Sequence, residues 1–186
     1  MLVDTGDVFV LPYTQGLPSP EELIENFQQI DEKLLLFLES LSELNFVDKV
    51  NNKHWSIEKK SGESLVILTS TKDNKETRWS VFTKDLEIYQ EELIPEGKEG
   101  ITQTGVVVAF PQDVATREAA KRGVVYCYLP TKRRTDLPFL IQADFLPTIG
   151  RGDIAENKWN EWLLKNLGGL AADAFDAIKD NPNFSD

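Results

Sequence analysis

One segment, Leu137 to Leu164, constrains the fold of this chain most, because it joins three different elements without a long linker. The apolar run Pro138–Phe145 predicts a strand, and a helix with its own start signal follows shortly afterwards. The loop between them carries one arginine, Arg151, flanked by Gly150 and Gly152. This arrangement places a permanent cation on a loop between two rigid elements, which is how proteins present arginine to anionic groups, often phosphates.

Two helices are predicted from their start signals. Ser19-Pro20-Glu21-Glu22 combines a capping box with proline at the first helical position, and the apolar residues that follow predict a helix over Pro20–Ser42. The second half of this helix is apolar nearly all round, so we expect it to be buried on more than one side. Asp153-Ile154-Ala155-Glu156 repeats the capping pattern and predicts a second helix that ends at Asn181-Pro182, with a kink or break at Gly168-Gly169.

The remaining apolar segments predict strands. A strand directly at the N-terminus and an antiparallel meander precede the most apolar strands, which we expect at the centre of the sheet. The expected ranges are Gly6–Pro12, His54–Lys59, Ser64–Ser70, Thr77–Lys84, Ile101–Phe110, Gly123–Leu129 and Pro138–Phe145. The sequence therefore predicts an α+β fold: a mixed β-sheet with two long packing helices and a small antiparallel β meander, in a single domain over residues 1–186.

Charge and composition exclude several functional classes. The net charge is −11 with a sequence pI of about 4.6, which disfavours nucleic-acid binding over the whole surface, although a local basic patch can override it. No apolar stretch approaches the roughly 20 residues that cross a bilayer, and the N-terminus has no signal-peptide pattern. Cys127 is the single cysteine, and its apolar surroundings predict an inert core thiol. We expect a soluble, cytoplasmic protein without membrane contact.

The motifs of a self-contained enzyme are missing. His54 is the single histidine, which we expect to be structural, and one His with one Cys does not supply the usual metal ligands. There is no nucleophile elbow and no dinucleotide fingerprint, and Gly97-Lys98-Glu99-Gly100 does not match a phosphate loop. No spacing among the acidic residues singles out a magnesium site. We therefore expect no metal and no cofactor held by this chain alone.

Three groups of residues remain as candidates for binding. Arg151 precedes a helix N-terminus, where an anion is also favoured, but it could instead pair with Asp144, Asp153 or Glu156. The basic cluster Lys132, Arg133 and Arg134 is either a solvated loop tip or a contact for an anion or partner. Trp159 and Trp162 share one helix face, which indicates packing on the sheet more than a partner-binding surface.

The order of these segments resembles the region that follows the ATP-binding domain in sacsin-type ATPases. These proteins belong to the GHKL superfamily, with the heat-shock chaperones, gyrase B, histidine kinases and MutL. The matching segments cover nearly the whole chain, and together they are moderately specific. They are Gly6–Pro12, Leu35–Leu38, Leu129-Pro130, Pro138-Phe139, Ala143–Phe145, Arg151, Ile154 and Trp159–Leu163.

This resemblance implies a role for the chain. Residues 1–18 would be the last strand and linker of an absent ATP-binding domain, and the rest a transducer-like domain. Arg151 would contact the γ-phosphate of ATP held by the upstream domain of the same polypeptide. ATP and Mg²⁺ are then implied for the full-length protein, a chaperone-like ATPase, and the chain alone would not be catalytic. The alternative is a stand-alone protein-protein interaction module without nucleotide chemistry, which binds a client or partner.

Overall fold

The structure is a computed structural model that describes residues 19–49, 51–113, 116–117, 120 and 123–179. The predicted strand Gly6–Pro12, the predicted domain boundary within residues 1–18 and the predicted helix end at Asn181-Pro182 lie outside the described residues. The chain divides after Ile30 into two units, residues 1–30 and 31–186, which are described separately below.

The described part of the first unit contains one helix, α1 (Pro20–Gln28). The predicted capping box is confirmed: the Glu22 amide donates to Ser19 Oγ (3.1 Å), and the Ser19 amide donates to Glu22 Oε2 (2.7 Å). The predicted length is wrong, because α1 ends at Gln28 and not at Ser42. Asp31 starts a separate 3₁₀ turn, η1 (Glu32–Leu35), by accepting a hydrogen bond from the Lys33 amide (2.8 Å). Such local side-chain bonds compete with helix continuation.

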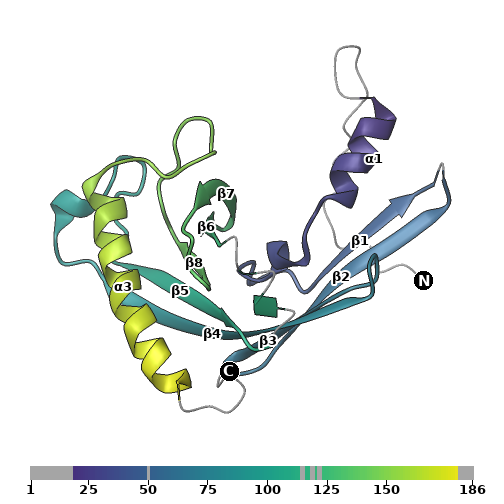
Figure 1. Cartoon of the computed structure of the whole chain (residues 1–186). Helices are drawn as coiled ribbons and strands as arrows, with labels where there is room; N and C mark the ends of the chain where they lie inside the picture. The colour runs from purple at the N-terminus through teal and green to yellow at the C-terminus, as the bar shows by residue number, and fades with distance from the viewer. Residues whose placement is uncertain (1–18, 50, 114–115, 118–119, 121–122, 180–186) are drawn as a thin grey trace, which may run out of the picture. The chain divides into compact units, whose positions relative to one another are not determined.

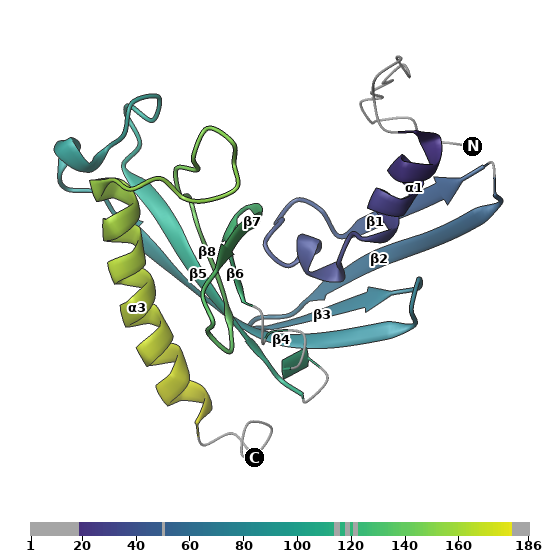
Figure 2. The ribbon, with the colours of Figure 1, turned by 45° about the horizontal axis from the view of Figure 1, so that its top comes forward.

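The second unit is built on one eight-stranded sheet with the order β1-β2-β3-β4-β5-β8-β6-β7 (Figures 1 and 2). Every neighbouring pair is antiparallel except β6 and β8, which run parallel, so the sheet is mixed and the predicted α+β class is confirmed. A short 3₁₀ turn, η2 (Glu91–Leu93), follows β4. The strands are β1 (Glu43–Asp48), β2 (Lys53–Ser61), β3 (Leu65–Ser70), β4 (Lys75–Glu87), β5 (Gln103–Pro111), β6 (Val124–Cys127), β7 (Leu129–Arg134) and β8 (Leu140–Ala143).

The strands predicted within the described residues are found close to their expected positions, with two differences. β1 begins directly after the range predicted as helix, where no strand was predicted, and it forms one edge of the sheet beside β2. The predicted strand Gly123–Leu129 is interrupted at Tyr128, whose φ of 60° lies in the left-handed region. The chain turns there, so β7 pairs back on β6 and becomes the opposite edge.

The second helix, α3 (Lys158–Ile178), lies across one face of the sheet over β4 and β5 (Figure 1). It is continuous through Gly168 and Gly169. Its start differs from the prediction, because Asn157 is the cap and accepts a hydrogen bond from the Asn160 amide (2.8 Å), four residues after Asp153. The helix buries one apolar side against the sheet, and the core there includes Val106, Val108, Phe145, Ile154, Trp159, Leu163 and Leu167.

The opposite face of the sheet is covered in part by the turn around η1. Leu35, Leu36 and Phe37 are all buried, and the Phe37 ring lies 4.8 Å from that of Tyr126. The predicted burial of this apolar run is therefore confirmed, although it is not helical in the predicted way. The ion pair between Lys75 Nζ and Glu32 Oε1 (2.7 Å) ties η1 to the start of β4, with the carboxylate buried.

Candidate functional site

The loop between β8 and α3 is tied together at its base. We call residues 147–154 the Arg151 loop. Pro147 and Ile154 form a β-bridge, and the Thr148 amide donates to the Asp153 carbonyl (2.8 Å). The Arg151 amide donates back to the Thr148 carbonyl (2.8 Å), which closes the tip as a turn. The loop is thus a small hairpin-like projection whose tip is exposed.

Arg151 presents its side chain to solvent at this tip. Within the described residues, its guanidinium forms no hydrogen bond or ion pair. The local pairings that the sequence left open, with Asp144, Asp153 or Glu156, are not formed among the described residues; Asp144 instead pairs with Lys98, and Asp153 pairs with Arg133. Arg151 itself has a φ of 51°, which is uncommon for a residue with a side chain and occurs often at functional sites. The arginine is therefore available to an external anion.

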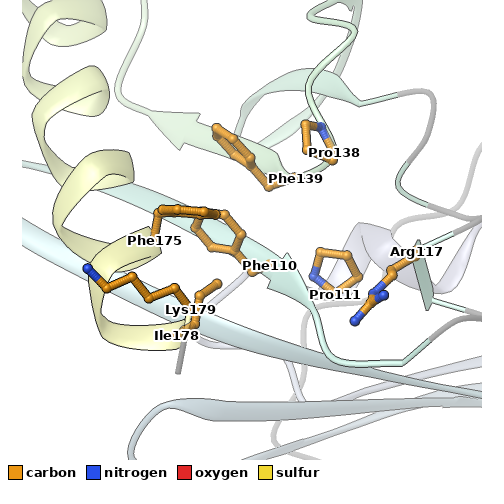
Figure 3. A pocket seen from close by; sticks show the side chains of 8 residues that line it. All are labelled: Phe110, Pro111, Arg117, Pro138, Phe139, Phe175, Ile178 and Lys179. Atoms are coloured by element: carbon orange, nitrogen blue, oxygen red, sulfur yellow. The ribbon is translucent and has the colours of Figure 1, made fainter. Parts of the chain in front are cut away.

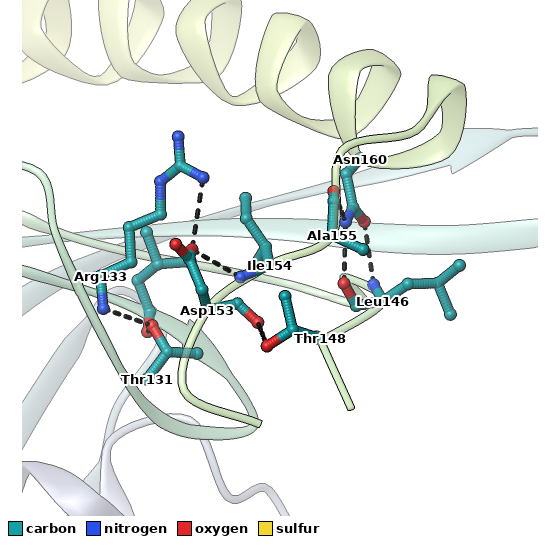
Figure 4. Close-up of polar contacts among 9 residues, drawn as sticks. Thr131, Arg133, Leu146, Thr148, Asp153, Ile154, Ala155 and Asn160 are labelled. Carbon is teal, nitrogen blue, oxygen red and sulfur yellow. Dashed lines mark hydrogen bonds and ion pairs between the residues drawn. The ribbon is translucent and has the colours of Figure 1, made fainter. Parts of the chain in front are cut away.

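The basic cluster lies beside this loop. The sequence allowed a loop tip, but Lys132, Arg133 and Arg134 lie on the edge strand β7, where all three side chains are exposed. The Lys132 amide donates to the Gly152 carbonyl (2.8 Å), and Arg133 Nη1 lies 3.3 Å from Asp153 Oδ1 (Figure 4). The backbone thus joins two candidates that are separate in the sequence. We call the set Lys132, Arg133, Arg134 and Arg151 the basic surface.

Sequence reasoning missed a further cation, Lys98. Its ammonium pairs with Asp144 and lies 6.0 Å from the centre of the Trp159 ring. Burial and the Asp144 carboxylate raise the pKa of the Cys127 thiol, while the charges of Lys98 and Arg151 oppose that rise. Both cations therefore lie within electrostatic range of Cys127. No local sequence signal could identify Lys98, because Asp144 is 46 residues away along the chain.

The two tryptophans differ in exposure. Trp159 is only 1 % exposed, and its indole Nε1 donates to the Asp144 carbonyl (2.8 Å), so it packs in the core. Trp162 is partly buried with its ring 5.3 Å from that of Trp159. The first turn of α3 is thus fixed to the end of β8, directly before the Arg151 loop begins.

An apolar groove lies near the last turn of α3 (Figure 3). Its volume is about 350 Å³, and the rings of Phe110 and Phe139 stack at 4.6 Å along it. Phe175 is 58 % exposed at its edge. At roughly 1.5 Å of rise per residue, α3 separates this groove from the Arg151 loop by about 30 Å. The groove is therefore a separate feature.

Other classes of site find no support in the part of the chain that the structure describes. No group of three or more His, Cys, Asp or Glu side chains there is arranged to hold a metal ion. His54 is exposed, and its Nε2 lies 3.3 Å from Asn45 Oδ1. None of the helices in this part combines the length and the apolar character that a membrane span requires.

Comparison with known proteins gives one distant match. Protein NO VEIN from Arabidopsis thaliana is 26 % identical over 164 residues, which cover 86 % of this chain. The match covers 6 % of that protein, so the chain spans only a small part of its relative. No family model matches the chain, and no solved structure matches it.

Proposed function

We propose that this chain is the middle, transducer-like region of a GHKL-type ATPase of the sacsin or chaperone kind, and that Arg151 senses ATP bound to an adjoining domain. The observation that carries this proposal is the position of Arg151. It is exposed at the tip of a tied loop, and its guanidinium has no partner among the described side chains, while Asp144 and Asp153 pair with Lys98 and Arg133.

The electrostatics of the surroundings support an anionic ligand. The chain carries a net charge of −11, yet Lys132, Arg133 and Arg134 lie beside the Arg151 loop. A concentration of cations on an acidic protein attracts a polyanion to that place and repels it elsewhere. Arginine also binds phosphate oxygens through two parallel hydrogen bonds, which fixes direction as well as charge.

In the proposed mechanism, this chain supplies only the arginine. ATP and Mg²⁺ would be held by the adjoining domain, and Arg151 would stabilise the charge that develops on the γ-phosphate during transfer to water. The match to a small part of a much longer relative is in keeping with a chain that works inside a larger polypeptide. The state of the nucleotide would then reach other domains through the elements that hold the Arg151 loop.

Sequencing the coding region upstream of Met1 tests the domain arrangement, because an ATP-binding domain should be encoded there in frame. In that full-length polypeptide, Arg151→Ala should lower kcat for ATP hydrolysis about a hundredfold or more, with KM for ATP nearly unchanged. Arg151→Lys should restore only part of the rate, because lysine lacks the bidentate geometry.

Arg78→Ala is the matched control, since Arg78 is another exposed arginine, on β4, and its guanidinium pairs with Glu76 (2.9 Å). Its turnover should equal that of the wild type. Unchanged turnover in Arg151→Ala would refute the sensing role.

A second candidate function is a stand-alone protein-protein interaction module. The observation in its favour is Ile149, which is fully exposed at the loop tip beside Arg151, so that the tip offers a partner an apolar contact next to charged ones. This candidate predicts no ATP-binding domain upstream of Met1. It also predicts that Ile149→Asp weakens partner binding as strongly as Arg151→Ala does.

A further inference from the structure

A buried asparagine on α3 contacts both sides of the Arg151 loop where the loop leaves the fold. Asn160 is 2 % exposed in the first turn of α3. Its Oδ1 accepts a hydrogen bond from the Leu146 amide (2.8 Å), and its Nδ2 donates to the Leu146 carbonyl (2.8 Å) and to the Ala155 carbonyl (2.7 Å) (Figure 4). One side chain therefore satisfies backbone groups on both legs of the loop.

These contacts leave little freedom at the base of the loop. The Ala155 amide also donates to the Leu146 carbonyl (2.8 Å), so the two legs are bonded to each other as well as to Asn160. If the Asn160 side chain is removed, the Leu146 amide loses its hydrogen-bond acceptor and the Ala155 carbonyl loses a donor, which costs free energy of folding. A shift of the first turn of α3 must therefore carry Leu146 and Ala155 with it.

The other side of the loop is fixed to β7 by weaker contacts. They are the single bond from the Lys132 amide to Gly152 and the partly exposed pair of Arg133 with Asp153, at 3.3 Å. Exposed pairs of this kind contribute little. The buried contact with α3 is thus the dominant restraint on where the loop tip lies.

From this geometry we infer that Asn160 is the positioning residue of Arg151, which couples the first turn of α3 to the loop tip. Only one consequence of the inference rests on the proposed function: α3 would move when the nucleotide that Arg151 contacts changes its state. The coupling itself is a property of the described residues and can be tested without nucleotide.

The test uses trypsin, which cleaves the Arg151–Gly152 bond at the exposed tip. In the 186-residue chain, well below the unfolding temperature, Asn160→Ala should raise the cleavage rate of this bond about tenfold or more, because local opening becomes easier when buried hydrogen bonds are lost. Mass spectrometry of the peptides identifies the bond that is cut.

The matched control is Asn166→Ala, the same substitution further along α3, where the Asn166 Nδ2 donates to the Trp162 carbonyl (2.9 Å) and to no residue of the loop base. It should leave the cleavage rate within about twofold of wild type. If Asn160→Ala unfolds, the fallback variant is Asn160→Asp, which keeps the acceptor oxygen. Hydrogen exchange of the Arg151 amide then replaces proteolysis, and we expect this exchange to be faster than in the wild type.

Equal cleavage or exchange in the Asn160 variants and the wild type would overturn the coupling and would leave the proposed role of Arg151 untouched. Conversely, faster cleavage in the Asn160 variants together with unchanged turnover in Arg151→Ala would support the coupling and overturn the sensing role alone. In the full-length polypeptide, both proposals together predict that Asn160→Ala lowers kcat and leaves KM nearly unchanged.

Discussion

Arg151 and Cys127 are linked at the scale of single residues, because the arginine charge acts on the thiol. Burial and Asp144 raise the pKa of Cys127, whereas Lys98 and Arg151 oppose that rise. Since Cys127 is the single cysteine, a thiol reagent labels the chain at one place. The pKa of the Cys127 thiol therefore depends on how close the Arg151 guanidinium lies to it in solution.

Replacing Arg151 by Ala should raise the pKa of Cys127 further. The thiolate fraction at a fixed pH near 8 then falls, and alkylation by iodoacetamide slows, because the thiolate is the reactive form. The pH profile of the alkylation rate measures this shift. Glu76→Gln serves as a control far along the sheet. Coinciding profiles for Arg151→Ala and wild type would show that the loop does not lie near Cys127.

The ion pair of Lys75 with the buried Glu32 carboxylate predicts a pH dependence of stability. Burial acts to lower the pKa of Lys75, but the hydrogen bond and charge of Glu32, with Asp31 and Asp73, raise it above the usual value. A group whose pKa is raised on folding stabilises the fold at every pH below its unfolded pKa of about 10.4, and this stabilisation is lost as pH rises through the folded pKa.

Lys75→Met should therefore lower the free energy of unfolding by about 1–3 kcal/mol at pH 7, because the buried Glu32 carboxylate loses its partner. The difference from wild type should shrink above about pH 10.5. Urea unfolding at pH 7, 9 and 11 checks both parts. Lys60→Met, at an exposed position on β2, is the control and should cost little at any pH. A constant difference across this range would contradict the assigned role of the pair.

At the scale of elements, α3 is continuous where its sequence suggests a break. Gly168 and Gly169 are exposed, and a Cβ built on either meets nothing within 4 Å. Packing of the apolar side of the helix on the sheet supports these residues in spite of their low propensity. Gly123 is different, because its Cβ would lie 2.9 Å from the Leu137 and Phe139 carbonyl oxygens.

Alanine at Gly168 or Gly169 should therefore stabilise the chain by about 0.5–1 kcal/mol each, through the restricted unfolded state and the higher helix propensity. Gly123→Ala should destabilise it, since the neighbouring backbone must shift. Chemical denaturation of the three variants measures the signs. A loss of stability in both helix variants would mean that α3 is broken at the glycines in solution.

The elements that the sequence predicts well are those with strong local signals. The capping box at Ser19 and the apolar runs that form β3 and β5 are local, and they are found close to where they are expected. The end of α1 was predicted too late, because the apolar spacing continues past Asp31 although Asp31 caps a separate turn there. β1 was missed since its alternation of half-buried and exposed residues follows from its place at the sheet edge.

At the scale of the whole molecule, the candidate site is assembled from segments that are distant in sequence. Arg151 was identified from its loop, and the cluster on β7 from its charge. Their contact was not predictable, since it depends on the crossover that places β6 and β7 beyond β8 in the sheet. The same applies to Asn160, which has no sequence signal because its function depends on backbone groups of the loop base.

The central claim is that Arg151 touches the terminal phosphate of a bound nucleotide, and protection from trypsin tests this contact most directly. In the full-length polypeptide, a non-hydrolysable ATP analogue should slow cleavage of the Arg151–Gly152 bond about tenfold or more, because a guanidinium bound to phosphate cannot enter the protease. ADP should protect far less, and other tryptic peptides of the same digest provide the internal standard. Equal cleavage of this bond with the analogue, with ADP and without nucleotide would contradict the claim.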